Sequence, residues 1–187
     1  MRYIHYIRKS TDDREHQALS LETQERENLR RFGDQPDIDI LEKLEEKRSA
    51  KYPGRPVFNE MIQRIERGEA DGIIAWHPNR LARNTIDGGR LIYLLDTGKL
   101  KDLKFANYTF ENNPQGKFML GIVFANSKYE VDSLSVNVKS GNTTKRQRGW
   151  LPGSAPIGYL NVDRKGPRPI IPDPDRFPLV KRVWEQA

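Results

Sequence analysis

The segment Gly72–Trp76, with the sequence GIIAW, is the most apolar of the short runs in this chain and decides its fold class. A short continuous apolar run is typical of a strand that is buried on both faces of a parallel sheet. Arg2–Arg8, with the sequence RYIHYIR, is rich in Tyr and Ile and has the same character. Both segments are therefore predicted to be central strands of a parallel sheet.

Helical patterns alternate with strand patterns around these two segments. The sequence predicts further strands over Asp37–Leu44 and Lys104–Tyr108, and helices over Ser20–Gly33, Arg55–Gly68 and from the turn His77-Pro78-Asn79 to about Leu95. Gly88 and Gly89 within the last helix are interpreted as an accommodation to packing. This β-α-β-α-β-α-β order predicts an α/β fold with a mostly parallel sheet of four to five strands flanked by helices.

A helical pattern of unusual length begins after Pro114, and no helix breaker interrupts it before Gly141. A helix of this length extends beyond a compact domain, so part of it is expected to pack on another chain or on a ligand. Its apolar residues are predicted to form one stripe, which consists of Phe118, Met119, Ile122, Val123, Tyr129, Leu134 and Val138.

The chain is predicted to divide near residue 145. Residues 1–145 form one domain with the long helix at its end. From Trp150 the composition changes, and seven of the 12 prolines lie between Pro152 and Pro178. Residues 146–187 are therefore expected to be a linker and the start of a second module, which is truncated within a helical pattern that begins at Arg176.

The overall composition excludes several classes of protein. Hydrophobic residues make up 36% of the 187 residues and charged residues 31%, and the mean hydropathy of −0.80 is typical of a soluble protein that can build a core. No apolar run approaches the roughly 20 residues of a membrane-spanning helix, and the N-terminus lacks the apolar segment of a signal peptide. Cysteine is absent, which rules out disulfide scaffolds, zinc ribbons and thiol nucleophiles. A cytoplasmic protein without a membrane partner is expected.

The net charge of +6 is concentrated in the last quarter of the chain. Residues 1–138 contain 22 basic and 22 acidic residues, whereas residues 139–187 contain 10 basic and 4 acidic residues. A neutral body with a basic C-terminal part indicates a polyanionic partner, most often nucleic acid. A solvated basic tail without a partner is the alternative.

Two groups of residues could carry chemistry at one edge of the predicted sheet. Tyr6, Arg8 and Ser10 alternate along the first strand, so their side chains are predicted to point the same way. Ser10 follows the carboxyl end of that strand, where open α/β sheets bind their ligands. Arg80 and Arg83 follow the GIIAW strand, three residues apart, which would place both on one helix face. A serine among arginines favours attack on a phosphodiester, because guanidinium groups bind phosphate oxygens and stabilise charge at phosphorus.

Each of these residues also has a purely structural interpretation. Ser10 could be a turn residue, Arg8 could pair with a surface acid, and Arg80 and Arg83 could be solvated helix charges. The coincidence of both groups at one edge of the sheet favours function. Neither a metal site nor a Gly-rich phosphate loop is expected, because the three histidines lack metal-ligand spacing and no glycine-rich motif is present.

The motifs resemble the catalytic domain of serine site-specific recombinases of the resolvase/invertase family. The resemblance covers about residues 2–145 and is carried by Tyr6–Thr11 (YIRKST), Leu19–Gln24 (LSLETQ) and Arg80–Asn84 (RLARN). Gly149–Tyr159 (GWLPGSAPIGY) and Ile171–Asp175 (IPDPD) resemble the junction to the DNA-binding recombinase domain of the large serine recombinases. The chain is therefore most similar to the N-terminal part of a large serine recombinase of the integrase or transposase type.

The resemblance implies that Ser10 attacks a DNA phosphate and forms a phosphoserine link to the 5′ end, after which strands are exchanged and rejoined. The phosphoserine conserves the energy of the broken bond, so the resemblance implies no cofactor and no metal. The residues that match the family's active site are the arginines Arg8, Arg80, Arg83 and Arg55, with Gln24 and Tyr6 in support and Ser49 as a weaker match.

The resemblance also implies double-stranded DNA as the partner, a homodimer on each site and a tetramer in the synaptic complex of two sites. The long helix would be the dimerisation helix, and its basic end would cross the DNA minor groove. The candidate DNA-binding residues there are Lys139, Lys145, Arg146 and Arg148. This assignment agrees with the charge distribution.

Three positions depart from the family's pattern. Asn79 stands where the family usually has Asp, Glu130-Val131 stands in place of Glu-Arg, and Val136 stands where an acidic residue is common.

Three alternative functions stay open. A complete small resolvase or invertase is disfavoured by the proline-rich stretch. A non-catalytic DNA-binding relative that kept the fold stays open because of Asn79. A metal-dependent nuclease is disfavoured because no acidic cluster follows the strands.

Overall fold

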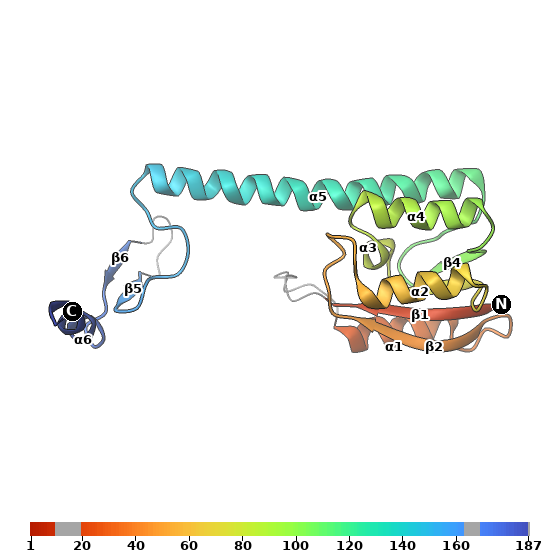
Figure 1. Cartoon of the computed structure of the whole chain (residues 1–187), viewed down its shortest axis with the longest axis horizontal. Helices are drawn as coiled ribbons and strands as arrows, with labels where there is room; N and C mark the ends of the chain where they lie inside the picture. Colours follow the sequence, from red (N-terminus) through yellow and green to blue (C-terminus); the bar gives the residue numbers. More distant parts are fainter. Residues whose placement is uncertain (10–19, 163–168, 187) are drawn as a thin grey trace. The chain divides into compact units, whose positions relative to one another are not determined.

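The computed structural model describes residues 1–9, 20–162 and 169–186, and the chain divides into two units, Met1–Asp132 and Ser133–Ala187 (Figure 1). The first unit is built on a sheet of four parallel strands in the order β2-β1-β3-β4. The strands are β1 (Arg2–Arg8), β2 (Asp39–Glu46), β3 (Gly72–Ala75) and β4 (Asp102–Phe105). The predicted parallel α/β fold is confirmed, with four strands, and each predicted strand overlaps an observed one.

Helices cover both faces of this sheet (Figure 1). One face packs against α1 (Leu21–Phe32), and the other packs against α2 (Pro56–Glu66), α4 (Thr85–Asp96) and the start of α5 (Pro114–Gln147). The short helix α3 (Pro78–Leu81) lies between β3 and α4 in the chain. Helices separate the strands because a parallel strand can begin only after a crossover returns the chain to the same end of the sheet.

The central strand β1 divides its side chains between two hydrophobic clusters. Ile4 and Tyr6 pack with Phe58 of α2 in the larger cluster, whereas Tyr3 packs with Phe32 of α1 in the smaller one. All of these side chains are buried. Because successive side chains of a strand point to opposite faces, a strand covered on both sides is expected to be apolar over most of its length. The prediction of central, doubly buried strands is therefore confirmed.

The boundaries of α1 follow the capping signals of the sequence. Ser20 Oγ accepts a hydrogen bond from the Thr23 N–H at 3.1 Å, which satisfies one of the free N–H groups of the first turn. At the other end, the Gly33 N–H donates to the Leu29 carbonyl at 2.7 Å. Local sequence thus sets both ends of this helix.

The prediction of one continuous helix from Asn79 to about Leu95 is wrong. The chain forms α3, leaves the helical conformation at Ala82 (φ −145°, ψ 140°), and enters α4 only after Asn84 (φ −141°, ψ 156°). Arg80 belongs to α3 and Arg83 to the break between the two helices. The two arginines therefore do not share one helix face, and the spacing argument that placed them there fails.

The break between α3 and α4 has a physical cause in hydrogen bonds that a continuous helix would exclude. The Arg83 N–H donates to the Ala50 carbonyl at 3.1 Å, in a different loop of the protein. Asn84 Oδ1 accepts the Asp87 N–H at 2.9 Å and so caps the new helix. These bonds replace the intrahelical bonds that the break removes.

The helix α5 is long, as predicted, and most of the predicted apolar stripe is exposed on it. The helix continues through Gly141 to Gln147. Its buried residues are Leu120, Phe124 and Ser127, which follow one another at intervals of four and three residues. The residues of the predicted stripe that are exposed are Phe118, Met119, Ile122, Tyr129, Leu134 and Val138. The side of α5 that packs on the first unit is therefore distinct from most of the predicted stripe, and the packing of the stripe on another chain or a ligand stays a prediction.

Gly88 permits the close approach of α4 and α5. A Cβ atom on Gly88 would lie 3.1 Å from Cδ2 and 3.3 Å from Cβ of Phe124, whereas one on Gly89 would have no neighbour within 4 Å. The packing interpretation of this glycine pair is therefore confirmed for Gly88 and wrong for Gly89.

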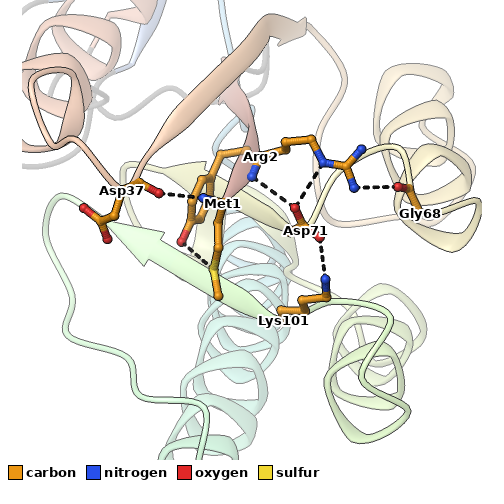
Figure 2. Close-up of polar contacts among 7 residues, drawn as sticks. Met1, Arg2, Asp37, Gly68, Asp71 and Lys101 are labelled. Atoms are coloured by element: carbon orange, nitrogen blue, oxygen red, sulfur yellow. Dashed lines mark hydrogen bonds and ion pairs between the residues drawn. The ribbon is translucent and has the colours of Figure 1, made fainter.

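Polar contacts at the amino edge of the sheet join segments that are distant in sequence (Figure 2). Asp71 Oδ2 accepts hydrogen bonds from the backbone and the guanidinium of Arg2, at 3.1 and 3.2 Å, and Asp71 Oδ1 accepts one from Lys101 at 2.7 Å. The hydrogen bonds from Lys101 and Arg2 hold the pKa of Asp71 well below its usual range. Arg2 also donates to the Gly68 carbonyl at 2.8 Å. This edge is formed by the amino ends of the strands and lies opposite the edge at which open α/β sheets bind ligands. These contacts therefore stabilise the sheet without taking part in the predicted site.

The second unit contains a small hairpin and a final helix. β5 (Tyr159–Asn161) pairs with β6 (Ile170–Pro172) in antiparallel orientation, and α6 spans Phe177–Glu185. The rings of Tyr159 and Phe177 meet edge to face, with centroids 5.2 Å apart. This contact packs the hairpin against α6.

Candidate active site

The carboxyl end of β1 carries a fully buried arginine. Arg8 is the last residue of the strand and is 0% exposed. The amide of Gln24, on α1, bridges the backbone of Arg8, because Gln24 Nε2 donates to the Arg8 carbonyl at 3.0 Å and Gln24 Oε1 accepts the Arg8 N–H at 3.4 Å. Gln24 therefore holds the backbone at the end of β1, two residues before Ser10 in the sequence. Ser10 itself lies outside the described residues.

Arg55, just before α2, joins three parts of the fold in one buried polar cluster. Its side chain is 1% exposed. Nη2 donates to Asp87 Oδ2 at 2.9 Å and to the Leu81 carbonyl, and Nη1 donates to the Tyr6 hydroxyl at 3.1 Å. The guanidinium also lies over the ring of Phe58, 4.0 Å from its centroid. Burial raises the pKa of Tyr6, so its hydroxyl is neutral when it accepts this hydrogen bond.

The loop before Arg55 is tied to the α3–α4 break through one carbonyl group. Ala50 accepts the Asn84 side-chain amide at 3.0 Å, in addition to the Arg83 N–H. The same Asn84 Nδ2 donates to Asp87 Oδ2 at 2.8 Å. Ser49, the weaker match to the family's site, is half-buried, and its Oγ accepts the Lys51 N–H at 3.3 Å.

The residues after β3 form a tight turn that carries Asn79 and Arg80. His77 Nδ1 accepts the Asn79 N–H at 3.2 Å, and the His77 carbonyl accepts the Arg80 N–H at 2.9 Å. An Nδ1 acceptor requires a neutral imidazole, and burial lowers the pKa of His77 accordingly. Arg80 is 4% exposed, and its guanidinium lies 5.4 Å from the centroid of the Trp76 ring. Asn79 Oδ1 is buried and accepts no hydrogen bond from the described part of the chain.

Several arginines lie at this edge within the described part of the chain. The buried arginines are Arg8, Arg55 and Arg80, and Arg83 is half-buried. Arginine is almost never fully buried unless it is paired. The buried carboxylates near these residues are Asp87, which binds Arg55, and Glu46, which ends β2. The described part of this edge thus carries four guanidinium groups, which are the side chains best suited to bind phosphate oxygens.

The structure places the described members of the predicted site at one edge of the sheet. Tyr6, Arg8 and Gln24 lie at or beside β1, Arg55 precedes α2, and Asn79, Arg80 and Arg83 follow β3. Their roles in catalysis stay predictions. The candidate DNA-binding residues Lys139, Lys145 and Arg146 are exposed on the last part of α5, and the exposed Arg148 lies over the Trp150 ring at 5.4 Å.

Three residues that organise this edge were not predicted from the sequence, namely His77, Asn84 and Asp87. Asn84 and Asp87 have a recognisable signal, because a capping residue followed three positions later by an acid resembles a capping box at a helix start. His77 has no such signal, since histidine is not among the preferred capping residues.

The described ranges contain neither a metal-binding cluster nor a membrane span. Within residues 1–9, 20–162 and 169–186, no three His, Asp or Glu side chains are grouped so that they could hold a metal ion. No helix in the same ranges is long and apolar enough to cross a membrane.

The fold and this edge define a class of protein. It is an open parallel α/β domain with buried arginines at the carboxyl ends of its strands. Comparison with known families assigns the chain more closely. Residues 3–151 match the family described as "Resolvase, N terminal domain", and since this match covers most of the chain, the protein belongs to that family. The resemblance to serine recombinases is thereby confirmed.

Two individual proteins illustrate the similarity. The "Putative DNA recombinase" of Bacillus subtilis (strain 168) is 25% identical over 162 residues, which are 86% of this chain and 31% of that protein. The chain thus spans less than a third of the length of this curated relative. The crystal structure of the N-terminal catalytic domain of TP901-1 integrase superposes with a TM-score of 0.51 at 20% identity, over 71% of this chain and 98% of that domain. This second similarity concerns the fold.

Proposed function

We propose that the chain is the catalytic domain of a large serine recombinase, followed by a linker and the start of a DNA-binding domain from residue 146. The observation that carries the proposal is the group of buried arginines at the carboxyl edge of the sheet, in a member of the resolvase family. Ser10 follows the buried Arg8 by two residues in the sequence. The reaction is site-specific recombination of double-stranded DNA.

The chemistry follows from a serine hydroxyl beside arginines. Ser10 Oγ attacks a DNA phosphorus and loses its proton, the bond from phosphorus to the 3′ oxygen breaks, and that oxygen takes up a proton. The 5′ phosphate stays bound to Ser10. Arg8, Arg80 and Arg83 bind the phosphate oxygens and stabilise the charge that develops in the transition state. A 3′ hydroxyl of the exchanged strand then attacks the phosphoserine and releases Ser10, so the reaction needs no cofactor and no metal.

The remaining predicted residues support this centre. Gln24 holds the backbone of Arg8 by a hydrogen bond, and Arg55 donates a hydrogen bond to the hydroxyl of Tyr6 on the same strand as Arg8. DNA is bound by a homodimer on each site and by a tetramer when two sites pair. The residues that contact DNA at the end of the long helix are Lys139, Lys145, Arg146 and Arg148.

The test is a search for a covalent adduct between the full-length enzyme and DNA that carries its recombination site. Ser10→Ala is expected to abolish the adduct and to leave binding to the site intact, because the change removes only the nucleophilic oxygen. The adduct is also expected to form in EDTA, since no metal takes part. An adduct that persists in Ser10→Ala, or that maps to Ser20 or Ser49, would contradict the assignment. Cleavage that stops in EDTA and returns with Mg²⁺ would indicate a metal-dependent nuclease instead.

One observation favours a second candidate, a relative with weakened cleavage or with DNA binding alone. Asn79 replaces the acid usual at this position, and its buried Oδ1 accepts no hydrogen bond within the described part of the chain. An amide cannot act as a base and holds a neighbouring arginine less firmly than a carboxylate does. The rate of adduct formation in Asn79→Asp, compared with the wild type, separates the two candidates.

A further inference from the structure

Asp87 is a buried carboxylate in the first turn of α4, and the predicted catalytic mechanism does not use it. Its exposed fraction is 4%. Burial of a carboxylate is unfavourable unless hydrogen bonds and an opposite charge compensate for the lost water. Asp87 Oδ2 accepts two hydrogen bonds, from Arg55 Nη2 at 2.9 Å and from Asn84 Nδ2 at 2.8 Å. Its contacts therefore connect α4 with the residues before α2 and with the α3–α4 break.

Asp87 is the counterion of Arg55. The hydrogen-bond acceptors that the described structure gives to the Arg55 guanidinium are Asp87, the Leu81 carbonyl and the neutral Tyr6 hydroxyl. Only Asp87 among them carries a negative charge. The orientation in which Arg55 reaches Tyr6 of β1 thus depends on Asp87, since an arginine that is 1% exposed has little water to replace a missing partner.

Asp87 also determines the backbone of the turn that carries Arg83. Its N–H donates to Asn84 Oδ1 at 2.9 Å, and its carboxylate accepts from the other side of the same amide. Asn84 Nδ2, which is held in this way, donates to the Ala50 carbonyl oxygen at 3.0 Å. The Arg83 N–H donates to the same carbonyl oxygen. The conformation of the α3–α4 break is therefore coupled to Asp87 through Asn84.

We propose that Asp87 is a positioning residue for the recombination reaction, which orients Arg55 against β1 and locks the turn that carries Arg83. This inference rests on the proposed function for its consequence in catalysis, whereas the orientation of Arg55 can be measured without DNA. In this role Asp87 acts through Arg55 and Asn84.

The variants separate positioning from simple loss of stability. Asp87→Asn keeps the shape and one acceptor oxygen but removes the charge. Asn84→Ser keeps a good helix cap and removes the amide donor, so it is a milder test that preserves the start of α4. Asp96→Asn is the matched control, because Asp96 is an exposed acid on the same helix that pairs with Lys117 at 2.9 Å.

Two measurements are made on the full chain. The first is nuclear magnetic resonance of the Arg55 guanidinium, whose signals are assigned by their absence in Arg55→Lys. The second is the single-turnover rate of adduct formation on duplex DNA selected from a random-sequence pool by binding to the wild-type chain. We expect separate, slowly exchanging guanidinium signals in the wild type and in Asp96→Asn, and their broadening in Asp87→Asn. We expect the adduct rate of Asp87→Asn to fall by about 10²-fold with unchanged DNA affinity, because small displacements of positioning groups cost this much.

Asn84→Ser is expected to give a smaller loss of rate, with the melting temperature and the amide spectrum of the sheet preserved. Unchanged Arg55 signals in Asp87→Asn, or a wild-type rate in that variant, would overturn the inference and leave the proposed function standing. If Asp87→Asn fails to fold, a wild-type rate in Asn84→Ser overturns it equally. A wild-type chain that forms no adduct contradicts the proposed function, and the guanidinium signals then still decide whether Asp87 orients Arg55.

Discussion

Asn79 lies in the turn after β3, where its N–H binds His77 Nδ1 and its Oδ1 is buried. An aspartate would have nearly the same shape and would add a negative charge beside Arg80, the next residue in the chain. That charge could hold arginines more firmly or accept a proton during cleavage. The residue at this position is therefore expected to affect the rate of the proposed reaction.

Asn79→Asp is expected to leave the fold and DNA binding intact and to raise the rate of adduct formation. General acid–base catalysis contributes roughly 10²–10⁴-fold, so a gain up to about 10²-fold corresponds to a restored positioning role. The measurement is the rate of adduct formation at fixed pH and salt. An unchanged rate would show that this scaffold does not need the acid, and that Asn79 gives no support to a weakened relative.

His5 is expected to make the stability of the first unit depend on pH. Its ring is 1% exposed and contacts Asn28 of α1, with 2.9 Å between His5 Nε2 and Asn28 Nδ2. Burial lowers its pKa from 6.5 to about 4, against a smaller opposing effect of Glu25. Below pH 6.5, His5 therefore binds a proton in the unfolded chain but stays neutral in the folded chain. The free energy of unfolding decreases as the pH falls toward 4.

The free energy of unfolding is expected to decrease by about 3 kcal/mol from this residue between pH 6.5 and pH 4. His5→Gln, which cannot titrate, should show a flatter dependence in denaturant titrations over the same range. His77 contributes in the same direction, so the difference between wild type and His5→Gln isolates His5. Parallel curves for the two proteins would show that His5 is not held neutral.

At the scale of the elements, the contact between α4 and α5 depends on the absence of a side chain at Gly88. Gly89, the next residue of α4, has open space at the corresponding position. The two glycines have the same helix propensity, so they form a matched pair in which only the contact with Phe124 differs.

Gly88→Leu is expected to reduce the free energy of unfolding by about 1–3 kcal/mol, because the added atoms overpack the interface with Phe124. Gly89→Leu should increase it by up to about 1 kcal/mol through better helix propensity alone. Chemical denaturation followed by circular dichroism measures both. Equal effects of the two changes would mean that α5 is free to move away from α4.

For the whole molecule, the distribution of charge is the feature that bears on DNA binding. The positive excess lies in residues 139–187, and the exposed basic residues near the end of the long helix belong to it. Affinity for DNA that rests on such residues depends on salt, because each bound phosphate releases counterions.

Replacement of the four candidate residues by Gln is expected to remove most DNA affinity. The slope of log affinity against log salt should flatten by about 0.9 for each phosphate that the protein no longer binds. The replaced residues are Lys139, Lys145, Arg146 and Arg148. The control replaces four exposed basic residues of the first unit, namely Arg26, Arg30, Arg67 and Lys99. Equal decreases in affinity in both proteins would show that the basic C-terminal part contributes to DNA binding only through the net charge of the protein.

The elements and their order could be predicted from the sequence because the signals for them are local. Strands buried on both faces are rich in apolar residues, so Arg2–Arg8 and Gly72–Trp76 could be recognised without tertiary information. The cap at Ser20 is equally local, since its bond spans three residues. The edge that carries the arginines followed from topology, because the carboxyl ends of parallel strands meet at one edge of a sheet.

The interruptions of those elements and the sides on which they are covered depend on tertiary contacts. The helix predicted after β3 breaks because Arg83 and Asn84 bind Ala50, more than 30 residues earlier in the chain, and no local periodicity contains that contact. The side of α5 that is buried is the side that contacts α4. The pairing of Arg55 with Asp87 joins residues 32 positions apart, so the burial that gives this pair its importance exists only once the chain has folded.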